Sequence, residues 1–233
     1  MTYWDQLQKA VRERGPAPLV TWVSDFGRID LSTVTFANAV SKAGNFLVDG
    51  LELDEDSSIA VELGNHWQSP VWLGAALATG IQLKPDADVM FSDADCAKSW
   101  HGSKDALVVI SRDPFGMPAK DLPDGFVNGS AEVRTYGDFF APRWINEQEV
   151  LKTETENFTW DALTGHARAL QIKFGITDGD CIGFLDPSDL LNRVALTVVL
   201  PMIAGVSAVL VDQHNPDLAA ITKQEKINRI ITD

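Results

Sequence analysis

The sequence predicts an α/β fold with two similar lobes, each a mostly parallel sheet flanked by helices. Strands and helices alternate along the chain, which favours parallel sheets with helices on both faces. Residues 35–84 are predicted to form a helix, an acidic turn, a strand, a polar loop, a second helix and a second strand, and residues 159–211 repeat this order. With 233 residues, 45% of them hydrophobic, the chain is long enough for a sizeable core.

The first unit begins where Ser32 or Thr33 can cap a helix. Apolar residues follow at helical spacing on one face: Phe36, Ala39, Val40, Ala43 and Leu47. Gly50 is placed to end this helix, and the mostly apolar run 58–63 is typical of a buried parallel strand. Ser69-Pro70 predicts the start of a second helix, with proline at its first position, and Gly80 predicts its end.

The second unit has the same order of elements with small shifts in length. A helix is expected from Thr159 to about Gly175, then a strand at 181–185. Ser188 is the expected cap of a helix that reaches about Ala204, and a strand at 206–211 completes the unit. Residue identity between the units is low. They are either an internal repeat or two ordinary α/β units that coincide.

The remaining segments predict further elements. The N-terminal helix should end at Gly15-Pro16, and strands 19–23 and 28–31 should form a hairpin around Asp25-Phe26-Gly27. Short buried strands are expected at 89–91 and 107–110, with Asp93 capping a helix between them.

Residues 111–129 are rich in Pro, Gly and Asp and predict a loop, and 132–135 predict a strand. An irregular connection near 140–145 suggests two lobes, residues 1–142 and 143–233. At the C-terminal end, Asn215-Pro216 should start a helix, and 223–231 should form an amphipathic segment.

Composition excludes several classes of function. Nineteen basic and thirty-three acidic residues give a net charge of −14, which repels nucleic acid and anionic membranes. Two distant cysteines, Cys96 and Cys181, fit a reducing cytoplasm. Residues 194–211 carry no charge and reach transmembrane length, but Pro201 and Gly205 divide them. The repeat makes this stretch a buried helix and strand, without membrane insertion.

The first unit resembles the opening of the AMP-forming adenylating enzymes, which include acyl-CoA synthetases, luciferases and peptide-synthetase adenylation proteins. The resemblance rests on a helix starting at Thr35-Phe36, Gly50, an acidic turn, the strand Ile59-Ala-Val-Glu-Leu63, Asn65 and a small-residue helix ending at Gly80. It covers roughly the first half of such an enzyme, whose N-terminal domain contains two similar α/β subdomains. More closely, the chain resembles a family of short actinobacterial proteins of unknown function.

The chemical motifs of the adenylating enzymes are missing. Their triphosphate loop is rich in Thr, Ser and Gly and ends in Pro-Lys, so that backbone amides and hydroxyls hold the phosphates. The loop Ser111-Arg-Asp-Pro-Phe-Gly-Met-Pro-Ala-Lys120 has Gly, Pro and Lys in order, but it lacks the Ser/Thr/Gly run and comes too early. Tyr136-Gly137-Asp138 echoes the adenine motif and fits a turn better. The resemblance therefore implies the fold without adenylation.

The sequence shows no clear motif for metal binding, dinucleotide binding or nucleophilic catalysis. The histidines His66, His101, His166 and His214 are scattered and lack the spacing of metal ligands, so no metal site is expected. No dinucleotide-binding glycine motif and no nucleophile elbow occurs. No cofactor is predicted by these motifs, although a nucleotide or CoA ligand stays open through the resemblance.

One positional prediction remains. Ligands of open α/β sheets bind beyond the carboxyl ends of the strands. The polar loops expected there carry the candidate ligand-binding residues Asn65, His66, Trp67, Asp186 and Ser188. The alternative is that these residues only cap the helices that follow.

These observations predict a degenerate relative of the acyl-CoA synthetases that acts as a binding or assembly protein without adenylating. The alternative is an enzyme or ligand binder with a remodelled nucleotide, acyl or CoA pocket. The larger enzymes cover the two α/β subdomains with a β-subdomain and a mobile C-terminal domain. A homodimer or a protein partner is therefore expected to cover the same surface here.

Overall fold

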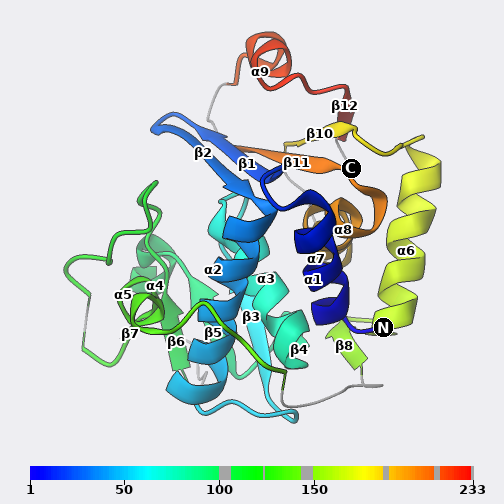
Figure 1. Cartoon of the computed structure of the whole chain (residues 1–233). Helices are drawn as coiled ribbons and strands as arrows, with labels where there is room; N and C mark the ends of the chain where they lie inside the picture. The colour runs from blue at the N-terminus through cyan, green and yellow to red at the C-terminus, as the bar shows by residue number, and fades with distance from the viewer. Residues whose placement is uncertain (100–105, 123, 143–148, 186–188, 213–215, 232–233) are drawn as a thin grey trace.

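A computed structural model describes residues 1–99, 106–122, 124–142, 149–185, 189–212 and 216–231 (Figure 1). Within these residues the strands form two sheets, one of five strands in the order β12-β10-β11-β1-β2 and one of seven in the order β7-β6-β5-β3-β4-β8-β9. We call them the smaller and the larger sheet. In Figure 1 they lie on either side of a central group of helices that includes α1, α2 and α3.

Both sheets are mostly parallel, as predicted. Among the described strands, the antiparallel pairs are β1 with β2 and β8 with β9. The smaller sheet contains β1 (Pro18–Ser24), β2 (Gly27–Ser32), β10 (Cys181–Phe184), β11 (Ser207–Asp212) and β12 (Arg229–Ile231). The larger sheet contains β3 (Ser58–Glu62), β4 (Gln82–Leu83), β5 (Val89–Ser92), β6 (Ala106–Val109), β7 (Val127–Asn128), β8 (Glu149–Lys152) and β9 (Asn157–Thr159).

The helices connect these strands and pack between or outside the sheets. The first half of the chain contributes α1 (Tyr3–Arg14), α2 (Thr33–Asn45), the π-helical turn η1 (Phe46–Gly50), α3 (Gln68–Thr79), α4 (Ala94–Ser99), α5 (Gly129–Glu132) and the 3₁₀ turn η2 (Val133–Thr135). The second half contributes α6 (Trp160–Lys173), α7 (Leu190–Val194), the π-helical turn η3 (Ala195–Val199), α8 (Leu200–Ala204) and α9 (Leu218–Glu225).

One hydrophobic core joins the two sheets. In the smaller sheet, Trp22 and Leu210 belong to this core, whereas the alternate residues Val23 and Val211 pack with Ile221 of α9 on the outer face. This two-residue alternation is what a sheet covered on both faces requires. The outer face of the larger sheet is covered in the same way by α4.

Helix α3 lies at the centre of the molecule, and all of its residues are buried. Its small residues let neighbouring helices approach closely. A Cβ atom on Gly74 would lie only 2.5 Å from the Tyr3 hydroxyl of α1 and 3.2 Å from a methyl group of Val40 in α2. Gly80 ends α3 in the left-handed conformation, with φ of 82°, as the sequence predicts.

The two predicted units have the same order of elements, with β3 parallel to β4 in the first and β10 parallel to β11 in the second. Whether they superpose as a repeat stays a prediction. Each sheet contains strands from both sides of the predicted division at residue 142. Strands β1 and β2 precede residue 142 and belong to the smaller sheet, whereas β8 and β9 follow it and extend the larger sheet.

Several local predictions are confirmed. The N-terminal helix ends at Gly15, the hairpin of β1 and β2 forms, and Asp93 caps α4 through its carboxylate and the amide of Cys96 (2.9 Å). Residues 194–204 are helical and are followed by β11. Within the described residues, no helix is long and apolar enough to span a membrane.

Two local predictions are wrong, and a third is right only in part. Residues 132–135 end α5 and form η2 instead of a strand, because the Asn128 side chain caps a helical turn at the Ala131 amide. Ser69 does not cap α3, since the helix already begins at Gln68. Gly50 does end the helical stretch, as predicted, but it does so in a π-helical turn and not in a left-handed conformation.

At the C-terminal end, α9 is capped by Asp217, and the predicted amphipathic segment closes with strand β12. Asn215 lies outside the described residues. So does Ser188, the predicted cap of the helix after β10. Asp189 caps that helix through the Asn192 amide (2.7 Å).

Candidate functional site

Asn65 lies where the carboxyl ends of the two sheets meet. Its side-chain amide donates to the carbonyls of Phe184 (2.8 Å), Leu185 (3.3 Å) and Val211 (2.9 Å). These carbonyls belong to the ends of β10 and β11. The loop after β3 therefore contacts the end of β10, the strand that precedes the second predicted loop. Asp186 and Ser188 themselves lie outside the described residues.

His66 is fully buried next to Trp22, with ring centroids 4.7 Å apart. Its Nδ1 accepts from the Gln68 amide (3.3 Å) at the start of α3, so His66 partly serves as a helix cap. Burial lowers the pKa of His66 to about 3, and the Arg112 charge adds to this effect. The imidazole is therefore neutral near pH 7 and serves packing rather than acid–base chemistry.

Trp67 is half-buried beneath the loop 111–120. A Cβ atom on Gly116 would lie 3.3 Å from its indole ring. Gln68, the next residue, donates its side-chain amide to the Ser111 carbonyl (2.9 Å). The predicted residues Asn65, His66 and Trp67 thus cluster at the carboxyl edge. Asn65 binds the carbonyls at the strand ends, whereas Nε2 of His66 and Nε1 of Trp67 are buried without a hydrogen-bond partner among the described residues.

Arg112 is the residue at this edge that the sequence did not single out. It donates to the Leu63 carbonyl (3.1 Å) beyond β3 and forms ion pairs with Asp212 of β11 and with Asp93 beyond β5, the latter at 3.8 Å. Asp212 also accepts from the Trp22 indole (3.3 Å). An arginine shortly after the buried strand β6 (Ala106–Val109) was the available signal, because that position places it near the carboxyl edge.

Several backbone amides of the loop 111–120 are occupied by groups of the loop itself. The Asp113 carboxylate accepts from the amides of Phe115 (2.8 Å) and Met117 (3.3 Å), and the Asp113 carbonyl accepts from Gly116 (2.9 Å). The Asp113 amide in turn donates to the Ser111 hydroxyl (3.1 Å). The Asp113 carboxylate thus accepts the amide hydrogen bonds that a phosphate group would accept in a phosphate-binding loop.

A second loop, between β8 and β9, is equally closed. The Thr153 hydroxyl accepts from the amides of Thr155 (3.3 Å) and Glu156 (3.0 Å), and the Thr153 amide donates to the Glu156 carbonyl (2.8 Å). This turn borders a pocket of about 310 Å³ at the carboxyl ends of β3 and β4. The charged residues lining the pocket are Lys84 and Arg193 with Glu62, Glu154 and Asp189.

The segment Tyr136-Gly137-Asp138 is a turn held against α2. The Lys42 ammonium donates to the Tyr136 carbonyl (3.1 Å), and the Asn45 side chain donates to the Gly137 carbonyl (2.9 Å). These contacts account for the conformation of the segment without a bound adenine.

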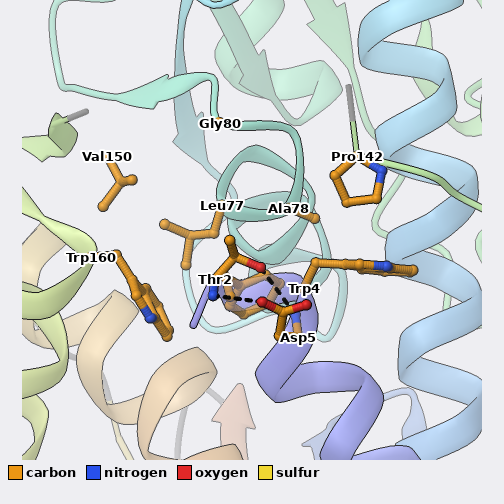
Figure 2. A pocket seen from close by; sticks show the side chains of 10 residues that line it. Thr2, Trp4, Asp5, Leu77, Ala78, Gly80, Pro142, Val150 and Trp160 are labelled. Atoms are coloured by element: carbon orange, nitrogen blue, oxygen red, sulfur yellow. Dashed lines mark hydrogen bonds between the residues drawn. The ribbon is translucent and has the colours of Figure 1, made fainter. Parts of the chain in front are cut away.

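A second pocket, also of about 310 Å³, lies between the first turn of α1, the last turn of α3, β8 and the start of α6 (Figure 2). Most of its wall is apolar: Tyr3, Trp4, Leu77, Ala78, Gly80, Pro142, Val150 and Trp160. Thr2 and Asp5 supply the polar groups, and they form a capping box in which each side chain accepts from the other's backbone amide (2.9 and 3.1 Å). We call it the α1 pocket.

Comparisons with known proteins agree with this architecture. No protein-family model matches the sequence. The chain is 29% identical over 251 aligned residues to a "TIGR03089 family protein" of Mycobacterium tuberculosis. The alignment covers 97% of this chain and 96% of that protein. An acyl-CoA synthetase of Brucella canis matches 99% of this chain with a TM-score of 0.81, at 14% sequence identity. The chain has an acyl-CoA synthetase fold. The predicted resemblance is confirmed at that level.

The match covers 47% of the Brucella canis chain, so this protein spans about half the length of that acyl-CoA synthetase. Within an acyl-CoA synthetase fold, the described loops at the carboxyl edge are held by internal contacts through Asn65, Arg112, Asp113 and Thr153. The wall of the α1 pocket, in contrast, is mostly apolar.

Proposed function

We propose that the protein is a non-adenylating relative of the acyl-CoA synthetases that acts by binding. The observation that carries the proposal is the closed loop 111–120. To hold a triphosphate, this loop would have to release the Asp113 carboxylate from two amides and overcome its negative charge. Each hydrogen bond to a charged group contributes about 1.5–3 kcal/mol, so opening the loop is costly.

The charges at the carboxyl edge support the same conclusion. The pocket beside the β8–β9 turn is lined by three carboxylates and two cations, and the whole chain carries a charge of −14. A triphosphate would enter against this field with few free amides to compensate. Losing even one preorganised donor costs about 10²–10³ in rate, so losing several should abolish the reaction.

The test is carboxylate-dependent exchange of pyrophosphate into ATP over a panel of short, medium and long carboxylic acids. An active acyl-CoA synthetase serves as the positive control. We expect no exchange above background with any acid. Robust exchange that is lost in Lys120→Ala would show that the loop 111–120 opens and holds phosphate, and it would overturn the proposal.

Self-association is part of this proposal. Three aromatic side chains are strongly exposed: Phe26 (83%), Phe115 (79%) and Phe139 (82%). Exposed aromatic side chains are enriched in protein interfaces. Light scattering coupled to size exclusion at micromolar concentration should show a dimer near twice the 25.5 kDa chain mass. A clean monomer would leave a different protein as the partner.

A further inference from the structure

Strand β2 forms one end of the smaller sheet and has no neighbour on its outer side among the described strands. With six residues it is longer than β7, β9 and β12, the other strands at the ends of the two sheets. Figure 1 shows the hairpin of β1 and β2 projecting from the side of the molecule. Proteins commonly protect an open strand edge with proline or lysine. Strand β2 contains neither, and its two charged residues, Arg28 and Asp30, have opposite signs.

The register between β1 and β2 determines which backbone groups face the open edge. Ser24 pairs with Gly27 across a two-residue turn, and Trp22 pairs with Ile29. Residues that flank a two-residue turn exchange hydrogen bonds, and bonded pairs then recur at every second position. Gly27 and Ile29 therefore bond to β1, whereas Arg28 and Asp30 direct their N–H and C=O groups to the open edge.

A second copy of the chain can pair antiparallel with these outward groups in three registers. One register places Arg28 opposite Arg28, and another places Asp30 opposite Asp30, so each opposes like charges. The third places Arg28 of each copy opposite Asp30 of the other, with the two Ile29 residues facing each other on the two-fold axis. Opposite charges in directly opposed positions stabilise an antiparallel pair, and like charges destabilise it. The charges therefore select the third register.

The side chains of β2 are positioned for this register. The Nε atom of Arg28 donates to Glu225 of α9 (2.9 Å), and its Nη2 atom donates to Asp30 (3.2 Å). Its Nη1 atom makes no hydrogen bond with a described residue, so one nitrogen is left to donate to Asp30 of the second copy. On the other face, Ile29 packs partly buried against the core. The two Ile29 side chains would extend that core across the axis.

The same register gives the exposed Phe26 an apolar neighbour. Its side chain is 83% exposed in the turn of the hairpin. Continued to the end of β2, the register places Phe26 opposite Ser32 of the second copy. Val34 lies two residues further, in the first turn of α2, and is 39% exposed. Contact between these side chains would remove apolar surface from water in both copies.

We propose that β2 is the surface through which the protein self-associates, with two copies pairing antiparallel along this strand. The two smaller sheets then form one continuous sheet. The proposal rests on the self-association proposed above and assigns it to a surface. The self-complementary order of Arg28 and Asp30 favours a second copy over a strand from another protein, and two-fold dimers are the commonest oligomers.

The experiment uses two variants that should each repel their own copies. Arg28→Asp makes both opposed positions acidic, and Asp30→Arg makes both basic. Each variant alone should have a dimer dissociation constant raised at least about tenfold over the unchanged protein. A one-to-one mixture of the two should form dimers again, because both opposed pairs then carry opposite charges. Light scattering and sedimentation equilibrium over a range of concentrations measure all three.

Arg12→Asp is the matched control, since it makes the same charge change at an exposed position of α1. It should dimerise like the unchanged protein. Circular dichroism verifies that every variant folds, because Arg28→Asp also removes the contact with Glu225.

A single cysteine tests the register. Ile29→Cys, in a chain that also carries Cys96→Ser and Cys181→Ser, should form a disulfide-linked dimer on oxidation. Directly opposed residues between two bonded pairs lie about 4.5 Å apart at Cα, within the range that a disulfide spans. Ile172→Cys in the same background is the control, since Ile172 is 81% exposed on α6, and it should stay largely monomeric on denaturing gels.

Charge variants that each dimerise as tightly as the unchanged protein, or a mixture that stays monomeric, would overturn the proposal. So would a dimer that Ile29→Cys does not cross-link. In these cases a dimer of the unchanged protein would still support self-association, through a surface other than β2. A monomeric unchanged protein would overturn both, whereas the non-adenylating function is tested separately by pyrophosphate exchange.

Discussion

At the scale of single residues, the carboxyl edge is built from side chains that satisfy backbone groups of neighbouring strands. Asn65 reaches three carbonyls with one amide group, which has only two hydrogens, so its longest contact, to Leu185, shares one. Arg112 joins β3, β5 and β11 in a similar way. These polar side chains hold the two sheets together at the edge where a ligand would otherwise bind.

Asn65→Ala should therefore lower the free energy of unfolding by about 2 kcal/mol, because partly buried carbonyls lose their donors. Asn38→Ala is the matched control, since Asn38 lies on α2 and makes no side-chain hydrogen bond with a described residue. It should leave stability unchanged or raise it slightly. Urea denaturation measures both, and equal effects of the two substitutions would show that Asn65 does not tie the sheets.

His66 predicts a pH dependence of stability. Its pKa is about 3 in the folded chain and about 6.5 when unfolded, so the unfolded state binds the extra proton between these values. This contribution to stability is complete above pH 6.5 and is lost as the pH falls towards 3. Between pH 7.5 and 5 the protein should lose about 1–2 kcal/mol more than His66→Gln. Parallel pH profiles of the two proteins would contradict this.

At the scale of elements, α3 depends on glycine and alanine for its contact with α1. Gly74→Ala should lower stability by about 1–3 kcal/mol, because the new methyl group meets the Tyr3 hydroxyl. Gly165→Ala, also inside a helix but with no atom within 4 Å, should raise stability by about 0.5–1 kcal/mol. Adding Tyr3→Phe to Gly74→Ala should recover part of the loss, since the hydroxyl makes no hydrogen bond with a described residue. Thermal or urea unfolding checks all three, and loss of stability in both glycine variants would exclude the steric explanation.

Sequence patterns predicted most elements because their signals are local. The periodicity of α2, the glycine that ends α3 and the hairpin of β1 and β2 all follow from neighbouring residues. The prediction of a strand at 132–135 was wrong because the Asn128 side chain caps a helical turn there. Asn65 and Arg112 bind partners about 50 to 150 residues away, so local patterns can mark the two residues but cannot reveal which strands they join. The α1 pocket likewise combines four distant segments.

At the scale of the whole molecule, each sheet combines strands from the first and the second half of the chain. Arg14 of α1 adds to this by donating to the carbonyls of Pro201 (3.1 Å) and Val206 (3.0 Å). Fragments 1–142 and 143–233 should therefore not fold alone, because each lacks strands of its own sheet. Circular dichroism and hydrogen exchange of the separate and co-expressed fragments check this. A cooperatively folded 143–233 fragment would show that the second lobe is an independent domain.

The central proposal is that the described loops of this acyl-CoA synthetase fold do not hold a triphosphate. The most direct measurement is calorimetric titration of the full chain with Mg·ATP, beside an active acyl-CoA synthetase. We predict no saturable binding up to about 1 mM, because the described loops at the carboxyl edge are closed on Asp113 and Thr153. Saturable micromolar binding that Lys120→Ala weakens at least tenfold would contradict the proposal.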